Sequence, residues 1–127
     1  MAAADTHVLV RLLVQDDAAQ TRRAEAFLGS SRPLWISTVV LVETCWVLVS
    51  AYAWNRAQLA ALLEGLQDSP DFVLQSPQAV REAVARFKAS KADFPECLAL
   101  ELARVEGQLP FGTFDRAGGR LPGAEGL

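Results

Sequence analysis

Four acidic side chains stand beside apolar stretches that should be buried, and their chemistry points to a metal. Asp5 follows three alanines, Glu43 lies inside an apolar run, Glu96 opens a late helical stretch, and Asp115 follows "GTF". Carboxylates that converge repel one another unless a cation neutralises them. Hard oxygen ligands without a cluster of Cys or His favour Mg²⁺ or Mn²⁺ over zinc. Such an ion activates water and stabilises the charge on a phosphodiester undergoing in-line attack.

Each acid also has an ordinary structural explanation. Asp5 has the position of a helix N-cap, and Glu43 fits a buried acid paired with an arginine. Asp93 and Glu96 form the pattern Asp-x-x-Glu before an apolar run, which is typical of a capping box. Asp115, just before "RAGG", fits a turn residue. Taken singly, none of these signals identifies a site.

The elements that would position these acids alternate between extended and helical patterns. Extended patterns occur in "PLWIS", "DFVLQS" and "LPFGTFDR", whereas residues 8–14 fit both a strand period and a helical face. Helical patterns occur in "TRRAEAFLGS", where Gly29 is predicted to end the helix, in residues 39–52, and in "RAQLAALLEGLQDS", "PQAVREAVARFKAS" and "ADFPECLALELARVEG". The last of these is predicted to be helical from the spacing of Phe94, Leu98, Leu102 and Val105. This order predicts an α/β domain with a mostly parallel sheet, in which acids at the carboxyl ends of strands line one crevice.

Length and composition favour one soluble domain spanning residues 1–127. The chain has 51% hydrophobic residues, and its 12 basic and 15 acidic residues give a net charge of −3. Because this net charge does not attract nucleic acid, any nucleic-acid substrate would have to be held by local basic patches or a bound cation. Cys45 and Cys97 lie far apart beside a single histidine, so we expect neither a disulfide framework nor a zinc site. We interpret both as core residues in a reducing cytoplasm.

The stretch "WISTVVLVETCWVLVSAYAW", from Trp35 to Trp54, has roughly the length of a membrane span, and Glu43 is its only charge. Ser37 and Thr38 supply an N-cap signal inside it, which favours a short strand followed by a buried helix. Since residues 39–52 are apolar nearly all round, we expect that helix to be packed on several sides. This reading of the apolar stretch predicts no membrane association, and because the first residues lack a basic stretch before the apolar run, we expect no secretion.

Taken together, the four motifs resemble a known family. In order and spacing, "DTHVLVRLL", "STVVLVETCWVL", "ADFPECLAL" and "GTFDRAGGRLPG" are similar to the motifs of PIN-domain ribonucleases, in particular the VapC-type toxins of bacterial and archaeal toxin–antitoxin pairs. The resemblance covers nearly the whole chain and implies a Rossmann-like α/β/α sandwich with a central, mostly parallel sheet. It implies metal-dependent endonucleolytic cleavage of RNA, with Asp5, Glu43, Glu96 and Asp115 as catalytic carboxylates that bind Mg²⁺ or Mn²⁺. It further implies a cognate antitoxin protein as partner and a homodimer.

Two positions depart from the family pattern. The third acid is usually the second Asp of a motif similar to "ADFADAL", and Glu96 occupies that position here. Asp93, three residues earlier, is the alternative third acid and metal ligand. His7 stands where the family commonly has Asn, and we interpret it as a residue that orients Asp5. These departures keep a second hypothesis open, in which a PIN fold with impaired catalysis binds RNA or protein.

Further residues are assigned supporting roles by the same resemblance and by charge. Thr6 and Thr113 match small hydroxyl residues that flank the family's acids, and we expect them to support the metal ligands. As a group, the basic residues that flank the third and fourth motifs are candidate phosphate contacts, although solvated surface charge explains any single one. These are Arg86, Lys88, Lys91, Arg116 and Arg120.

Overall fold

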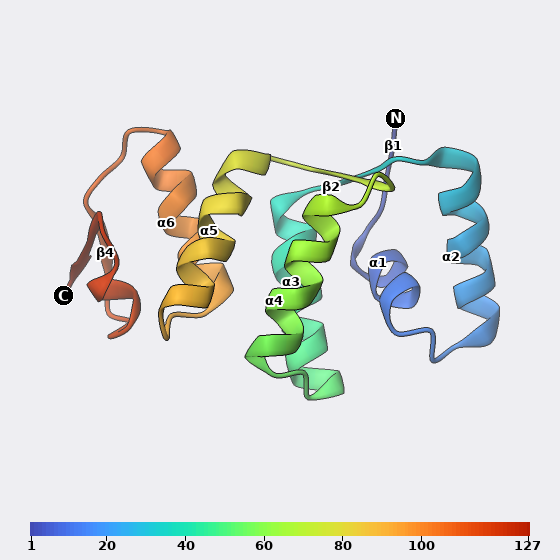
Figure 1. The fold of residues 1–127 in the computed structure, drawn as a ribbon, viewed down its shortest axis with the longest axis horizontal. Coiled ribbons are helices and arrows are strands. Elements are labelled where there is room, and N and C mark those ends of the chain that lie inside the picture. The colour runs from blue at the N-terminus through green and yellow to red at the C-terminus, as the bar shows by residue number, and fades with distance from the viewer. The chain divides into compact units, whose positions relative to one another are not determined.

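The computed structural model describes residues 1–127, in which six α-helices alternate with short strands that pair in parallel (Figure 1). The chain divides into two compact units, Met1–Gln75 and Ser76–Leu127. The order of parallel strands and helices confirms the predicted α/β class and is that of a Rossmann-like α/β/α fold.

The first unit contains a three-stranded parallel sheet in the order β1-β2-β3, formed by Ala2–Ala3, Leu34–Ile36 and Phe72–Leu74. In the register of these strands, Trp35 lies between Ala3 and Val73. Side chains alternate between the two faces of a strand, so Leu34 and Ile36 are buried while Trp35 is exposed. Parallel neighbours need long crossovers, and a pair of helices provides each of them.

The helices of the first unit are α1 (Thr6–Leu13), α2 (Ala18–Ser31), α3 (Thr38–Tyr52) and α4 (Arg56–Asp68). Each begins after a residue whose side chain accepts a hydrogen bond from a backbone N–H of the first turn. These N-cap residues are Asp5, Asp17, Ser37 and Asn55. Residues 8–13, which fitted either a strand or a helix in sequence, therefore belong to a capped helix that buries Leu9 and Val10.

The end of α2 differs from the prediction. Gly29 was expected to end the helix, but α2 continues to Ser31 and Arg32 is the first extended residue. A residue that precedes proline is sterically kept out of the helical region, and Pro33 follows Arg32 directly. Proline, and not glycine, therefore sets the boundary of α2.

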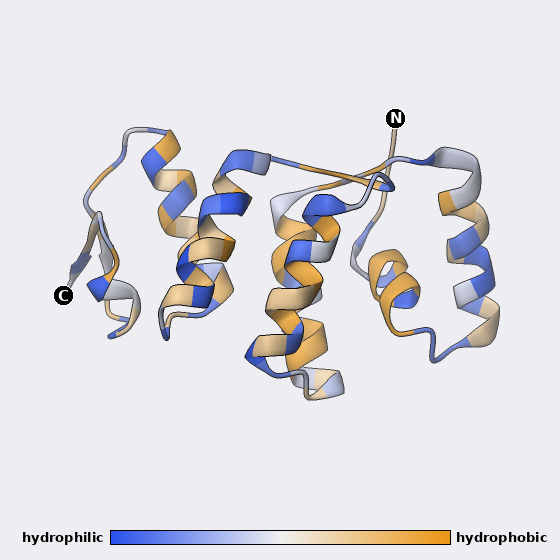
Figure 2. Cartoon of the chain, viewed as in Figure 1, coloured by the Kyte–Doolittle hydropathy of each residue, from blue (hydrophilic) through white to orange (hydrophobic).

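The apolar stretch from Trp35 to Trp54 forms strand β2 and helix α3, as predicted, with Ser37 as the N-cap. No helix in the structure combines the length and the apolarity that a membrane span requires. Apolar residues follow α3 along most of its length (Figure 2), and the helix buries Leu41, Cys45 and Leu48. However, Trp46 on the same helix is 69% exposed. We had expected α3 to be packed on several sides. Within the first unit it is packed on one side only.

The second unit consists of α5 (Pro77–Ala89), α6 (Phe94–Val105), β4 (Phe111–Thr113), a short 3-10 helix at Gly118–Arg120, and β5 (Ala124–Gly126). Strands β4 and β5 pair in parallel, with Phe111 opposite Ala124. The two helices pack on each other, and the rings of Phe87 and Phe94 meet edge to face with centroids 6.2 Å apart. This pair of helices supplies the core of the unit.

The buried face of α6 contains an acid that the sequence pattern did not predict. Val105 belongs to the apolar spacing that predicted this helix, yet it is 68% exposed, whereas Glu101 is only 2% exposed. Two arginines neutralise Glu101: Arg104 Nε lies 2.9 Å from its Oε2, and Arg86 Nε lies 3.5 Å from its Oε1. Arg104 also donates a hydrogen bond to the carbonyl oxygen of Pro122. This cluster ties the C-terminal segment to α6.

Candidate active site

In the first unit, Asp5 stands in the turn between β1 and α1. Its Oδ1 accepts a hydrogen bond of 3.1 Å from the backbone N–H of Val8, so the N-cap explanation is correct. The other carboxylate oxygen, Oδ2, has no hydrogen-bond partner within Met1–Gln75. Capping a helix and binding a ligand are therefore compatible roles for this side chain.

Glu43 lies on α3, and a residue of α1 forms a hydrogen bond with its side chain. The hydroxyl of Thr6, the first residue of α1, donates a hydrogen bond of 3.0 Å to Oε1 of Glu43. Within the first unit Glu43 is exposed and forms no ion pair, so the alternative of a buried acid paired with arginine does not describe it. The Thr6 contact fixes one oxygen of Glu43 and leaves Oε2 without a protein donor.

His7 is exposed directly after Thr6. Its ring forms no hydrogen bond with Asp5, which is instead oriented by the Val8 N–H.

His7 lines a hollow of about 360 Å³ that opens beside Asp5, against helices α1 and α2. The residues around this hollow are Asp5, His7, Val8, Arg11, Gln20, Arg23, Ala24 and Phe27. Sequence reasoning did not connect Arg23 or Phe27 with the first acid, because the local pattern indicates only an amphipathic helix.

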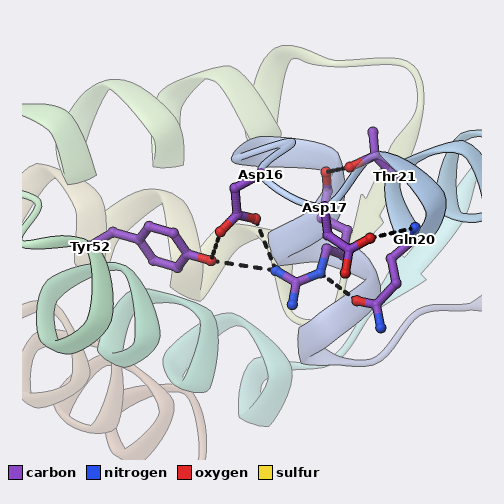
Figure 3. Close-up of polar contacts among 6 residues, drawn as sticks. Asp16, Asp17, Gln20, Thr21 and Tyr52 are labelled. Atoms are coloured by element: carbon purple, nitrogen blue, oxygen red, sulfur yellow. Dashed lines mark hydrogen bonds and ion pairs between the residues drawn. The ribbon is translucent and has the colours of Figure 1, made fainter.

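Arg11, which lines this hollow, takes part in a network of polar contacts with Asp16, Gln20 and Tyr52, and these three partners are labelled in Figure 3. Arg11 Nε donates a hydrogen bond of 2.5 Å to Oε1 of Gln20, and Arg11 NH1 lies 3.2 Å from Oδ1 of Asp16. The hydroxyl of Tyr52 on α3 donates to the other oxygen of Asp16 at 2.8 Å and lies 3.4 Å from Arg11 NH1. Arg11 therefore joins three helices, and its charge is compensated.

In the second unit, Asp93 is the N-cap of α6, and its Oδ1 accepts a hydrogen bond of 2.8 Å from the backbone N–H of Glu96. A complete capping box would have the Glu96 side chain accept from the backbone N–H of Asp93. Instead, Oε1 of Glu96 accepts a hydrogen bond of 2.5 Å from the hydroxyl of Thr113 on β4. The capping explanation is thus half correct, and the Glu96 carboxylate is directed to the fourth motif.

Asp115 is brought to the same place by the turn after β4. Its Oδ2 accepts a hydrogen bond of 2.6 Å from the backbone N–H of Gly118, and its own N–H donates to the Thr113 hydroxyl at 3.0 Å. A Cβ on Gly118 would lie 2.7 Å from Cγ of Glu96 and 3.0 Å from Oδ2 of Asp115. Gly118 is therefore the residue that lets the third and fourth acids lie side by side.

A second hollow, of about 770 Å³, is lined by several basic side chains of the second unit. Four of the five candidate phosphate contacts line it, namely Arg86, Lys91, Arg116 and Arg120, whereas Lys88 does not. No acid is among its lining residues. The Nε atom of Arg86 is buried without a hydrogen-bond partner, although it forms the longer ion pair with Glu101.

The two cysteines are core residues, as predicted. Cys45 is 3% exposed and Cys97 is fully buried. Burial raises the pKa of the Cys45 thiol to about 12. Because the thiolate is the reactive form of cysteine, Cys45 is inert at neutral pH.

The donor chemistry of the acids fits a hard divalent cation. Neither unit by itself brings three His, Cys, Asp or Glu side chains to one point. Each unit nevertheless offers carboxylate oxygens next to a threonine hydroxyl, and no arginine or lysine of the same unit pairs with these acids. Oxygen ligands of this kind suit Mg²⁺ and Mn²⁺.

Comparison with known families decides the assignment. A family model described as PIN domain matches residues 2–123. The chain belongs to the PIN-domain family. PIN domains are generally nucleases that typically use divalent metal ions, and PIN nucleases bind RNA. No curated protein and no solved structure matches the chain. The matched range includes all four sequence motifs that resemble those of PIN-domain ribonucleases.

Proposed function

We propose that this PIN domain is an endoribonuclease dependent on Mg²⁺ or Mn²⁺ and acts as the toxin of a VapBC-type pair. One repeated observation supports this. In each of the four motif acids, one carboxylate oxygen accepts a hydrogen bond from the protein and the other has no protein donor in its own unit. By contrast, the structural acid Glu101 has two arginine partners. The motif acids are thus oriented but not neutralised, as metal ligands must be.

In this proposal the cation is held by Asp5, Glu43, Glu96 and Asp115. When bound, the ion supplies charge stabilisation and activation of water for phosphodiester hydrolysis. Thr6 and Thr113 limit the rotation of Glu43 and Glu96, and the Val8 and Gly118 N–H groups do the same for the aspartates. Restricting these rotations before the ion binds lowers the entropy cost of assembling the site.

RNA would be held by the basic hollow of the second unit. Its lining contains four cationic side chains, of which Arg86 is paired with Glu101, and no acid, which suits the phosphates of an RNA backbone. Two of these cations, Arg116 and Arg120, follow Asp115 within five residues. A strand that occupies the hollow would therefore lie close to the fourth acid.

The toxin role adds a partner to this activity. We propose that a cognate antitoxin protein covers the acids in the cytoplasm and that the domain forms a homodimer. Expression of the chain without the antitoxin should arrest growth and leave cleaved RNA. Unimpaired growth with intact RNA would remove the toxin role, and sedimentation of monomers alone at high concentration would remove the dimer.

The nuclease activity is tested by incubating labelled total RNA with the protein in Mg²⁺, in Mn²⁺ and in EDTA. Asp5→Asn should abolish cleavage, because asparagine still caps the helix but cannot supply an anionic ligand. Asp17→Asn is a matched control, since Asp17 caps α2 in the same manner and is not a motif acid. It should cleave as the wild type does.

The identity of the third acid is tested by comparing Glu96→Gln with Asp93→Asn. If Glu96 is the ligand, only Glu96→Gln should lose metal-dependent cleavage. Loss in Asp93→Asn alone would transfer the role to Asp93. A folded wild type that binds RNA but cleaves none of it with either metal would support the alternative function, a binding module with impaired catalysis.

A further inference from the structure

The hollow beside Asp5 contains side chains to which neither the metal site nor the fold gives a role. We propose that it is a subsite for one unpaired nucleotide of the RNA substrate, with the base stacked on Phe27 and an adjacent phosphate paired with Arg23. This inference rests on the proposed nuclease function, because the ligand is a segment of the same RNA.

Charge is the first argument. The hollow is lined by two arginines, of which Arg11 is compensated by Asp16 at 3.2 Å. Arg23 is exposed and forms no ion pair or hydrogen bond in the structure. Its guanidinium is therefore available, and it has the fork geometry that matches phosphate.

Aromatic surface is the second argument. Phe27 lies one helical turn after Arg23 on α2 and is 38% exposed. Residues four apart lie on the same face of a helix, so the ring and the guanidinium border the hollow together. An aromatic ring next to a cation is a common arrangement for single-stranded nucleic acid, because the base stacks while the cation contacts the backbone.

Open hydrogen-bonding groups are the third argument. Oε1 of Gln20 accepts from Arg11, which leaves the Nε2 amide of Gln20 without a protein acceptor. The His7 ring likewise makes no hydrogen bond with the protein. Both residues line the hollow and offer polar atoms to the edge of a base. The volume, about 360 Å³, lies at the lower end of small-molecule sites, which suits one nucleotide better than a duplex.

Asp5 connects the subsite to the reaction. It forms part of the wall of the hollow and is the first of the motif acids. A nucleotide that occupies the hollow would therefore lie next to the phosphate that is cleaved. It follows that Phe27 and Arg23 influence which base is accepted at one position beside the cleavage point.

The first test measures binding in EDTA, so that it does not depend on catalysis. A fluorescein-labelled eight-nucleotide RNA of random sequence is titrated with the full chain and with four variants. Arg23→Ala and Phe27→Leu should each weaken binding about tenfold, whereas Phe27→Tyr, which keeps an aromatic ring for stacking, should weaken it far less. Arg22→Ala is the matched control, because Arg22 is an exposed arginine next in sequence that does not line the hollow.

The outcomes separate the subsite from the nuclease. If Arg23→Ala and Arg22→Ala bind the RNA with equal affinity, the hollow is not an RNA subsite. A protein ligand would then be the remaining candidate for it. A wild type that neither binds nor cleaves RNA would overturn both proposals. If the wild type cleaves, 5′-end sequencing of the products gives a second readout. Phe27→Leu should flatten the base preference at one position next to the cut, and an unchanged preference would overturn the subsite while the nuclease stands.

Discussion

Thr113 and Glu96 are joined by a hydrogen bond of 2.5 Å from the threonine hydroxyl to Oε1 of the glutamate. The same hydroxyl oxygen accepts a hydrogen bond of 3.0 Å from the backbone N–H of Asp115. One side chain thus positions the third and fourth acids of the proposed metal site. A similar contact, from Thr6 to Glu43, serves the second acid.

The Thr113 contact predicts the effect of removing its hydroxyl. Thr113→Val keeps the shape of the side chain but leaves Glu96 free to rotate, so affinity for Mn²⁺ should fall about 10- to 100-fold. Isothermal titration with Mn²⁺ measures this directly. Thr113→Ser retains both hydrogen bonds and should bind as the wild type does. Equal affinity in the valine and serine variants would show that Thr113 does not position Glu96.

Gly118 gives a prediction based on space. A Cβ at this position would lie 2.7 Å from Cγ of Glu96, which is closer than real Cβ contacts. Gly118→Ala should therefore displace the carboxylates and lower cleavage by about 100-fold. Gly65→Ala is the control, because no atom lies within 4 Å of the added methyl in α4. It should leave cleavage unchanged and stabilise the helix by about 0.5–1 kcal/mol. Wild-type cleavage by Gly118→Ala would contradict the packing described around these acids.

Local signals made a large part of this structure predictable from sequence. The caps at Asp5 and Asp93 and the turn at Asp115 depend on residues within three positions, and all three formed as predicted. Hydrophobic periodicity likewise predicted helices α2 to α6 and strands β2, β3 and β4, but it gave no sign of strand β5, which forms at Ala124–Gly126 in the glycine-rich tail. Where two local signals competed, as Gly29 and Pro33 do at the end of α2, the stronger steric restriction decided the boundary.

Contacts between distant residues were not predictable in the same way. The hydroxyl of Thr6 reaches Glu43 across 37 positions, and that of Thr113 reaches Glu96 across 17. Glu101 was missed for the same reason. The pattern of apolar residues on α6 gives no indication that an acid is buried, because its partner Arg86 comes from α5. Such pairs become visible only when the helices are packed.

The buried Glu101 predicts a cost in stability. Glu101→Gln keeps the volume but leaves two arginines without their counter-charge, and breaking a buried ion pair costs about 3–5 kcal/mol. Because the arginine side chains are 35% and 34% exposed, water reduces this cost, and we expect about 2 kcal/mol. Urea unfolding measures the free energy. Glu106→Gln, at an exposed position on the same segment, should change it by less than about 0.5 kcal/mol. A similar value for both variants would mean that the arginine pair does not stabilise the unit.

Cys45 predicts how stability depends on alkaline pH. Burial raises the pKa of its thiol from 9.0 to about 12, so above pH 9 the unfolded chain releases this proton while the folded chain retains it. The contribution of Cys45 to the free energy of unfolding is therefore present below pH 9 and is lost as the pH rises toward 12. The expected loss is about 1.4 kcal/mol between pH 8 and pH 10. Urea unfolding at the two pH values should show this loss in the wild type and a correspondingly smaller one in Cys45→Ala, which has no thiol to ionise. If both proteins lose the same stability, the Cys45 thiol ionises as readily in the folded chain as in the unfolded one, and its burial does not protect it.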